Sequence, residues 1–104
     1  MLFHKFVKEV HDWSESQGFW KDESQSRKVD FQLAKLALVH TEVSEACEDV
    51  RRGKLDELPL ELADIIIRTV NFASHYGIDI ESALSQKMEV NHRRQVLKEG
   101  NKQI

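Results

Sequence analysis

Apolar side chains recur at spacings of three and four residues along most of the chain, which is the period of amphipathic helices. The pattern predicts four helices, over about residues 2–17, 30–52, 56–77 and from 79 to somewhere before 100. Gly18 and Gly53 follow the first two, the third ends at Gly77, and Asp30 and Asp79 are candidate N-caps for the second and fourth. The fold class expected from this pattern is all-α, as a compact four-helix bundle.

The apolar faces of these helices predict which side chains lie inside the bundle. They are Leu36, Val39, Val43, Ala46 and Val50 on the second helix, Leu58, Leu62, Ile65, Thr69, Phe72 and Tyr76 on the third, flanked by Ile66, Val70 and Ala73, and Ile80, Ala83, Leu84 and Met88 on the fourth. The third helix is apolar over so wide a surface that one thin layer of helices can hardly cover it. We therefore expect a homodimer or a homotetramer.

Composition narrows the class of protein. With 104 residues, of which 40% are hydrophobic and 32% charged, the chain is expected to form one globular domain over residues 1–104. A formal net charge of −3 argues against binding to nucleic acid polymers, which favour a surplus of Lys and Arg.

Cys47 is the single cysteine, which fits a reducing compartment and, on an apolar helix face, is most often a small core residue. No stretch reaches the roughly 20 apolar residues of a membrane span, and residues 1–10 do not resemble a signal peptide, so a cytoplasmic location is expected.

Two pairs of carboxylates are the strongest candidates for chemistry. Glu42 and Glu45 lie on the second predicted helix, and Glu61 and Asp64 lie on the third, each pair separated by three residues. An i, i+3 pair projects from one face of a helix, so antiparallel packing about the turn at Lys54 makes all four acids converge. Asp49 continues the same face of the second helix.

Acids that converge in a semi-buried groove need compensating cations. Mg²⁺, or Mn²⁺ in its place, prefers oxygen ligands and bridges carboxylates to substrate phosphates, and a pair of such ions supports the hydrolysis of a phosphoanhydride. The alternative is that each pair is ordinary surface charge. Both pairs interrupt strongly apolar helices, where solvated charge is unexpected, and this favours a site.

Lys87, Asn91 and Arg94 form a polar stripe on the fourth predicted helix, at spacings i, i+4 and i+7. Two cations and an amide can hold triphosphate oxygens that no metal claims, although a solvated face is the simpler interpretation. Arg68, four residues after Asp64, can form an intrahelical ion pair with that acid.

Aromatic residues near the first turn offer a surface for a nucleobase. Trp13, Phe19 or Trp20 can stack on a base, and packing in the core or an interface is the alternative for each. Trp13 is our candidate for substrate binding.

These motifs together resemble the MazG-like all-α nucleoside triphosphate pyrophosphohydrolases, relatives of dCTP pyrophosphatase and of the dimeric dUTPases. The resemblance covers nearly the whole chain and rests on His11-Asp12-Trp13, Gly18-Phe19-Trp20, LALVHTEVSEACEDVRRG from Leu36, ELADIIIR from Glu61, YGIDIESAL from Tyr76 and KMEVNHRR from Lys87. It implies a four-helix fold that assembles as a dimer or a dimer of dimers.

The resemblance also implies a reaction and a division of roles. An (d)NTP is cleaved between its α and β phosphates to the monophosphate and pyrophosphate, and clearance of non-canonical nucleotides is one role for such an activity. The catalytic and metal-binding positions are Glu42, Glu45, Glu61 and Asp64, and Lys87, Asn91 and Arg94 contact phosphate or sugar. The preferred base, the acid that accepts a proton from water and the choice between dimer and tetramer stay open.

Three other interpretations remain. A di-iron carboxylate bundle uses two ExxH motifs, whereas Glu89-x-x-His92 is the one such motif in the chain. A phosphoribosyl-ATP pyrophosphatase shares the fold and the metal chemistry. A non-catalytic helical assembly module would carry the acids as surface charge.

Overall fold

The computed structural model describes residues 3–102 and contains no strand among them. Its helices are α1 (Phe3–Ser16), α2 (Lys28–Arg51), α3 (Leu58–His75) and α4 (Ile80–Lys102), with a short 3-10 turn, η1 (Glu23–Gln25), between α1 and α2. The all-α prediction and the number of helices are confirmed. The prediction of Asp30 as an N-cap is wrong, because α2 begins earlier and Asp30 lies in its first turn, where it pairs with Arg27 at 3.8 Å.

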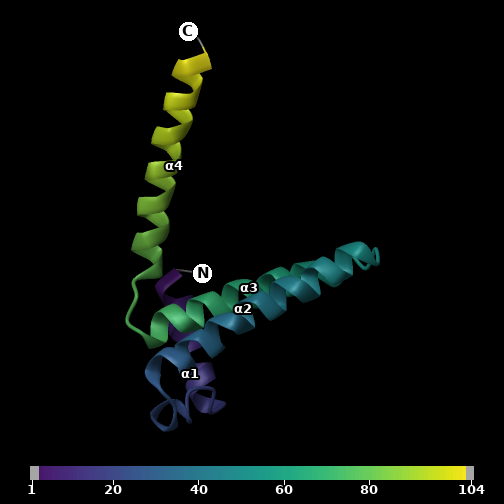
Figure 1. The fold of residues 1–104 in the computed structure, drawn as a ribbon, viewed down its shortest axis with the longest axis vertical. Helices are drawn as coiled ribbons and strands as arrows, with labels where there is room; N and C mark the ends of the chain where they lie inside the picture. Colours follow the sequence, from purple (N-terminus) through teal and green to yellow (C-terminus); the bar gives the residue numbers. More distant parts are fainter. Residues whose placement is uncertain (1–2, 103–104) are drawn as a thin grey trace.

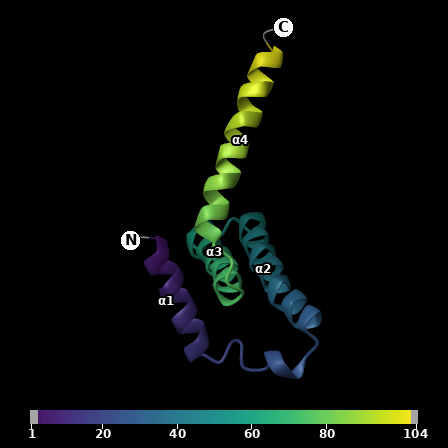
Figure 2. The same ribbon diagram turned by 90° about the vertical axis from the view of Figure 1, so that its left-hand side faces the viewer.

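An antiparallel hairpin of α2 and α3 forms the main body, and α1 packs against α3 (Figures 1 and 2). Gly53 closes α2 with φ +70°, a left-handed conformation that a glycine adopts without strain. The backbone N–H of Lys54 then donates to the Asp49 carbonyl at 2.8 Å, and that of Gly53 donates to Val50 at 3.1 Å. This closure turns the chain back, so the two carboxylate-bearing helices face each other.

Trp20 anchors the opposite end of the hairpin. It comes from the loop that precedes η1, yet it is only 5% exposed. Its ring stacks on His75 with centroids 3.7 Å apart, and Phe31 and Tyr76 approach from α2 and the end of α3. Of the two uses considered for this tryptophan, stacking on a base and packing, the structure shows packing.

The carboxylate of Glu23 links two rings of this aromatic cluster, those of His75 and Tyr76. Glu23 Oε1 lies 2.7 Å from His75 Nε2, and Glu23 Oε2 accepts the hydroxyl of Tyr76 at 2.7 Å. The two hydrogen bonds, from Tyr76 and from His75, lower the pKa of Glu23 below its ordinary value. Burial together with the neighbouring carboxylate raises the pKa of Tyr76 to about 12.

The fourth helix leaves the other three and projects away from them (Figures 1 and 2). Asp79 caps it as predicted, because its Oδ1 accepts the backbone N–H of Ser82 at 3.1 Å. The compact bundle expected from the sequence is not formed within one chain. The prediction that Leu84 and Met88 point inward is wrong here, since they are 50% and 51% exposed. The physical reason is the turn after α3, where Gly77 at φ +67° redirects the chain, and the helix then continues to Lys102 instead of ending before residue 100.

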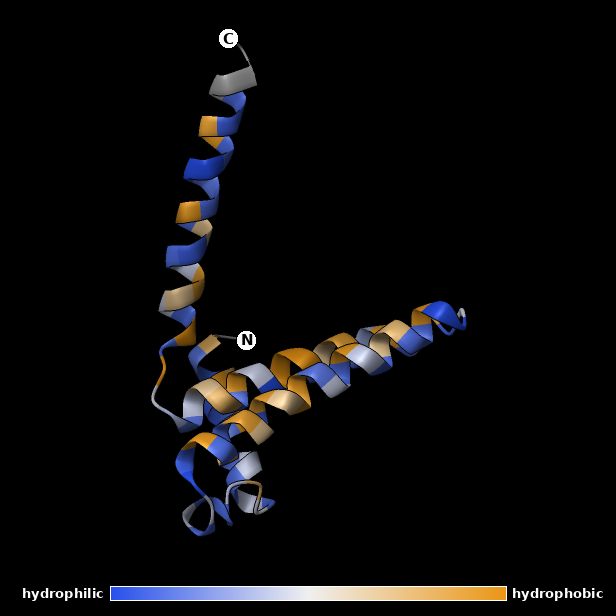
Figure 3. Cartoon of the chain, viewed as in Figure 1, coloured by the Kyte–Doolittle hydropathy of each residue, from blue (hydrophilic) through white to orange (hydrophobic). Residues whose placement is uncertain are grey.

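Figure 3 shows hydrophobic residues along both helices of the hairpin, and several of them are exposed, so the predicted apolar seams are only partly covered. The core contains Val10, Trp20, Phe31, Ala46, Val70 and Ala73. Val43, Val50, Leu62 and Ile66 are exposed, and so is Cys47, which was predicted to be a core residue. Each seam is wider than the single helix that packs on it, which leaves a hairpin groove of about 450 Å³ lined by Val43, Ala46, Cys47, Val50, Leu58, Leu62 and Ile65.

Over the described residues, no helix combines the length and the apolar character that crossing a membrane requires.

The two tryptophans provide a matched test of the aromatic anchor. Trp20 is 5% exposed and Trp13 is 58% exposed. We expect Trp20→Ala to lower the free energy of unfolding by about 3–5 kcal/mol, the range for large-to-small changes in a core. Trp13→Ala should change it by less than about 1 kcal/mol. Urea unfolding at a fixed protein concentration measures both, and equal losses would contradict the assigned packing.

Tyr76 is the single tyrosine of the chain, so tyrosinate absorbance reports on it alone. We expect the folded protein to titrate at about 12, compared with an ordinary value of 10.0. Because the phenolate is disfavoured only in the folded state, stability should fall as the pH rises from the ordinary value towards the raised one. Glu23→Gln should lower the native pKa without restoring it fully, because burial persists. A titration in Glu23→Gln identical to that of the parent would contradict the assignment.

Candidate functional site

Three glutamates converge across the hairpin. Carboxylate oxygens of Glu42 and Glu45 on α2 and of Glu61 on α3 all lie within 4.8 Å of one another. Glu42 and Glu45 share one face of α2 because they are three residues apart, and the turn at Gly53 brings Glu61 opposite them. The result is an acidic cluster, hereafter the glutamate cluster, in which each residue can offer one ligand atom.

Arg68 neutralises one member of the cluster. Its Nε donates to Glu42 Oε1 at 2.9 Å, linking α3 to α2. Glu42 is buried, at 8% exposure, and this ion pair compensates its charge. The sequence suggested a pairing of Arg68 with Asp64 instead. The contact across the hairpin was missed because residues 26 positions apart give no local signal.

Glu61 has no such partner among the described residues. Burial raises its pKa, and Asp49, Glu45, Asp64 and Glu42 raise it further by repulsion. Its Oε2 atom is buried and makes no hydrogen bond within the described part of the chain. A buried carboxylate oxygen without a partner is costly, and a hard cation would satisfy it. The donor set therefore fits a divalent metal ion such as Mg²⁺ or Mn²⁺.

Asp64 lies one turn beyond Glu61 on α3 and is exposed. Its carboxylate is close enough to raise the pKa of Glu61, although it is not one of the three residues whose oxygens gather within 4.8 Å. Asp49 on α2 acts on Glu61 in the same way. Asp64 also lines a neighbouring pocket, as does Glu42 of the glutamate cluster.

This neighbouring pocket has a volume of about 400 Å³ and is hereafter the side pocket. It is lined by Trp13, Phe19, Leu38, Glu42, Asp64, Ile67, Arg68 and Asn71. Apolar and aromatic walls with a few polar groups are typical of small-molecule sites. Trp13, our candidate for substrate binding, lies on its wall, and so does Phe19. Asn71 was not singled out from the sequence, where an asparagine in the middle of a helix gives no distinctive pattern.

Lys87, Asn91 and Arg94 are all exposed on α4. This helix packs mainly against the end of α3, and it diverges from the half of the hairpin that carries the acids (Figure 1). Within one chain the structure therefore does not bring this cationic stripe to the glutamate cluster. Glu89 and His92, the one ExxH motif, lie on the same projecting helix, so the di-iron alternative lacks its ligand set in one chain.

Residues 32–96 match the MazG nucleotide pyrophosphohydrolase domain. The chain belongs to the MazG family. The matched segment spans the glutamate cluster, Asp64 and the stripe on α4, and it begins after Trp13 and Phe19. No match was found among curated proteins or among solved structures. MazG proteins are typically metal-dependent nucleotide pyrophosphohydrolases, and the glutamate cluster of this member can bind a metal ion.

Metal binding should stabilise the folded chain. A ligand that binds only the folded state at about 100 times its Kd raises the free energy of unfolding by about 2.7 kcal/mol. We expect Mg²⁺ or Mn²⁺ to raise the melting temperature, and Glu45→Gln with Asp64→Asn to abolish the rise. Glu57→Gln neutralises an exposed acid just before α3 and is the matched control. A rise that persists in the double variant would place the metal elsewhere, and no rise in the parent would contradict a metal site.

Proposed function

We propose that this MazG protein is a nucleoside triphosphate pyrophosphohydrolase that requires Mg²⁺, with Mn²⁺ as a substitute. It cleaves a (d)NTP between the α and β phosphates and releases the monophosphate and pyrophosphate. The supporting observation is the glutamate cluster with its unpartnered Glu61 oxygen, within a chain of the MazG family. Clearance of non-canonical nucleotides in the cytoplasm is the physiological role that we attach to this activity.

We assign the following roles to the residues in this reaction. Glu42, Glu45, Glu61 and Asp64 would hold the divalent ions, and such ions would supply positive charge to stabilise the departing pyrophosphate. Arg68 keeps Glu42 oriented towards α3 through its Nε, and Arg68 also lines the side pocket. Trp13 and Phe19 form the aromatic wall for the nucleoside. One of the acids accepts the proton of the attacking water.

Pyrophosphate release tests this function directly. We expect metal-dependent release, with equimolar monophosphate, from at least one member of a panel of canonical and modified NTPs and dNTPs. Asp64→Asn should lower the rate by about 100-fold or more, because it removes charge that acts in the transition state. Glu57→Gln should leave the rate unchanged. Release of orthophosphate instead of pyrophosphate would contradict cleavage between the α and β phosphates.

Phosphoribosyl-ATP is the second candidate substrate, since it carries the same triphosphate. Folded, metal-stabilised protein that is silent on the whole NTP panel and releases pyrophosphate from phosphoribosyl-ATP would establish this alternative. A folded chain that neither binds metal nor hydrolyses any of these nucleotides would be a non-catalytic assembly module.

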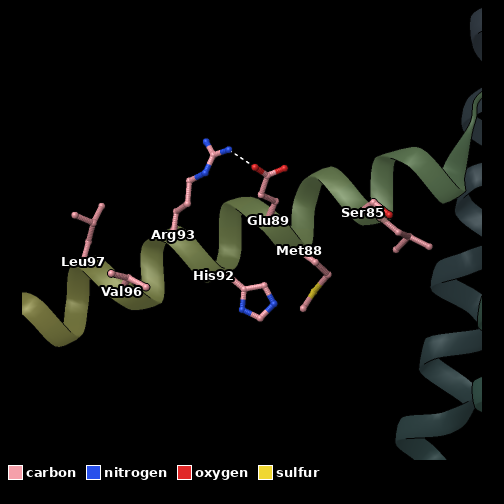
Figure 4. A pocket seen from close by; sticks show the side chains of 8 residues that line it. Ser85, Met88, Glu89, His92, Arg93, Val96 and Leu97 are labelled. Atoms are coloured by element: carbon pink, nitrogen blue, oxygen red, sulfur yellow. Dashed lines mark hydrogen bonds and ion pairs between the residues drawn. The ribbon is translucent and has the colours of Figure 1, made fainter.

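A homodimer or a dimer of dimers is part of this proposal, and α4 supports it. The groove along α4 is lined only by residues of that one helix, namely Leu84, Ser85, Met88, Glu89, His92, Arg93, Val96 and Leu97. Figure 4 shows Met88 and His92 on one side of the helix, opposite the ion pair between Arg93 and Glu89. A half-exposed apolar stripe on a projecting helix is unfavourable for a monomer. The hairpin groove of a second copy offers an apolar surface to cover it.

In such an assembly Lys87, Asn91 and Arg94 reach the glutamate cluster of the partner, which brings together the acids and the cations that one chain holds apart. Mixing two inactive variants tests this arrangement. Asp64→Asn and Asn91→Ala should each be nearly inactive alone, and a mixture refolded together should regain activity, because one of the two sites in a mixed dimer has both intact sets. No recovery in mixtures that sedimentation shows to be dimeric would contradict sharing of the site.

A further inference from the structure

Asp64, Arg68 and Asn71 lie along one stripe of α3, at spacings i, i+4 and i+7, and all three line the side pocket. Seven residues of helix correspond to about 10 Å. An acid of the candidate metal site, a guanidinium and an amide are therefore arranged in order along the pocket. A nucleotide whose phosphates lie at the acids places its base towards Asn71.

Asn71 is 5% exposed, which is unusual for an asparagine that does not cap a helix. Its Oδ1 accepts the indole Nε1–H of Trp20 at 3.2 Å. An indole nitrogen can only donate, so this hydrogen bond decides which way round the amide lies. The oxygen faces Trp20, and the Nδ2 donor faces away from it.

Trp20 cannot easily turn to release this amide. His75 stacks on it with an interplanar angle of 2°, and Phe19 and Tyr76 meet it edge-on. His75 is held in turn by Glu23, so the orientation of the amide depends on a chain of contacts that reaches η1. The Nδ2 group makes no hydrogen bond to the described residues, so it is free to donate to a ligand in the side pocket.

We infer that Asn71 is a specificity-determining residue that selects a nucleobase bearing a carbonyl, rather than an amino group, at position 4 of a pyrimidine or position 6 of a purine. An N–H donor pairs with a carbonyl oxygen, whereas opposite an amino group it leaves two donors facing each other, and one stays buried without a partner. Arg68 is also donor-only, so neither of these two side chains compensates an amino group. The inference rests on the proposed function, because it takes the side pocket as the nucleoside site.

Two pairs of substrates exchange this group together with the protonation of the adjacent ring nitrogen: ITP against ATP, and UTP against CTP. We expect kcat/KM to favour the carbonyl-bearing member of each pair by about 10-fold or more, since a site built to hydrogen-bond one group discriminates strongly against its mismatch. Asn71→Leu keeps the size of the side chain and removes the donor, so it should bring both ratios close to equality. Trp20→Phe removes the group that orients the amide and should weaken both preferences. Thr69→Ala, an exposed change on the same helix, should leave them unchanged.

The inference would be overturned if the two kcat/KM ratios were close to one in the parent, or if folded Asn71→Leu kept the ratios of the parent. In either case, pyrophosphate release would still support the proposed function. Should no nucleotide be hydrolysed, calorimetric Kd values for the α,β-methylene analogues of the same four nucleotides replace the rates. Tighter binding of the carbonyl-bearing analogues that is lost in Asn71→Leu would support the base selection although the reaction had failed. Equal binding of the four would overturn it.

Discussion

Repulsion between carboxylates that face each other across the α2 and α3 hairpin is the constraint on which the rest of the structure depends. Oxygens of Glu42, Glu45 and Glu61 lie within 4.8 Å of one another. The residues that surround them on α2 and α3 are largely apolar. Burial raises the pKa of Glu61, and repulsion from Asp49, Glu45, Asp64 and Glu42 raises it further. Arg68 relieves the repulsion at Glu42, and a divalent cation would relieve the remainder.

The aromatic anchor holds the other end of the hairpin together. Trp20, His75 and Tyr76 join η1 to the end of α3, and Glu23 fixes their orientation. The hairpin is thus closed at one end by the turn at Gly53 and at the other by packed rings. Between these ends α3 carries both kinds of chemistry, with acids in its first half and the buried amide of Asn71 in its second. A change in the packing of Trp20 would therefore alter the orientation of the Asn71 amide, which lines the side pocket.

Much of the local structure could be predicted from the sequence, because helical periodicity, the closing glycines and the Asp79 cap are encoded within a few residues. The pairing of Glu42 with Glu45 on one face followed from spacing alone, and the turn between the helices implied that Glu61 would face them. The direction of α4 could not be obtained in this way, since it depends on one turn after His75 and on which apolar surface is available for packing. The contact of Arg68 with Glu42 is also tertiary, so the local pattern favoured Asp64 as its partner. For Trp20 the sequence offered packing as one of two uses, and the structure shows that use, but its partners His75 and Tyr76 lie too far along the chain to be read from a local pattern.

The most direct measurement of the central claim is calorimetric titration of the protein with Mn²⁺ at mildly acidic pH, in buffers that differ in ionisation enthalpy. Because burial, and then repulsion from the neighbouring acids, raise the pKa of Glu61, a cation held by the cluster competes with a proton for this carboxylate. We expect saturable binding with proton release in the parent, and weakened binding without that release in Glu61→Gln. Binding that releases no proton, or that Glu61→Gln leaves unchanged, would show that the repulsion within the glutamate cluster is not what a metal ion relieves.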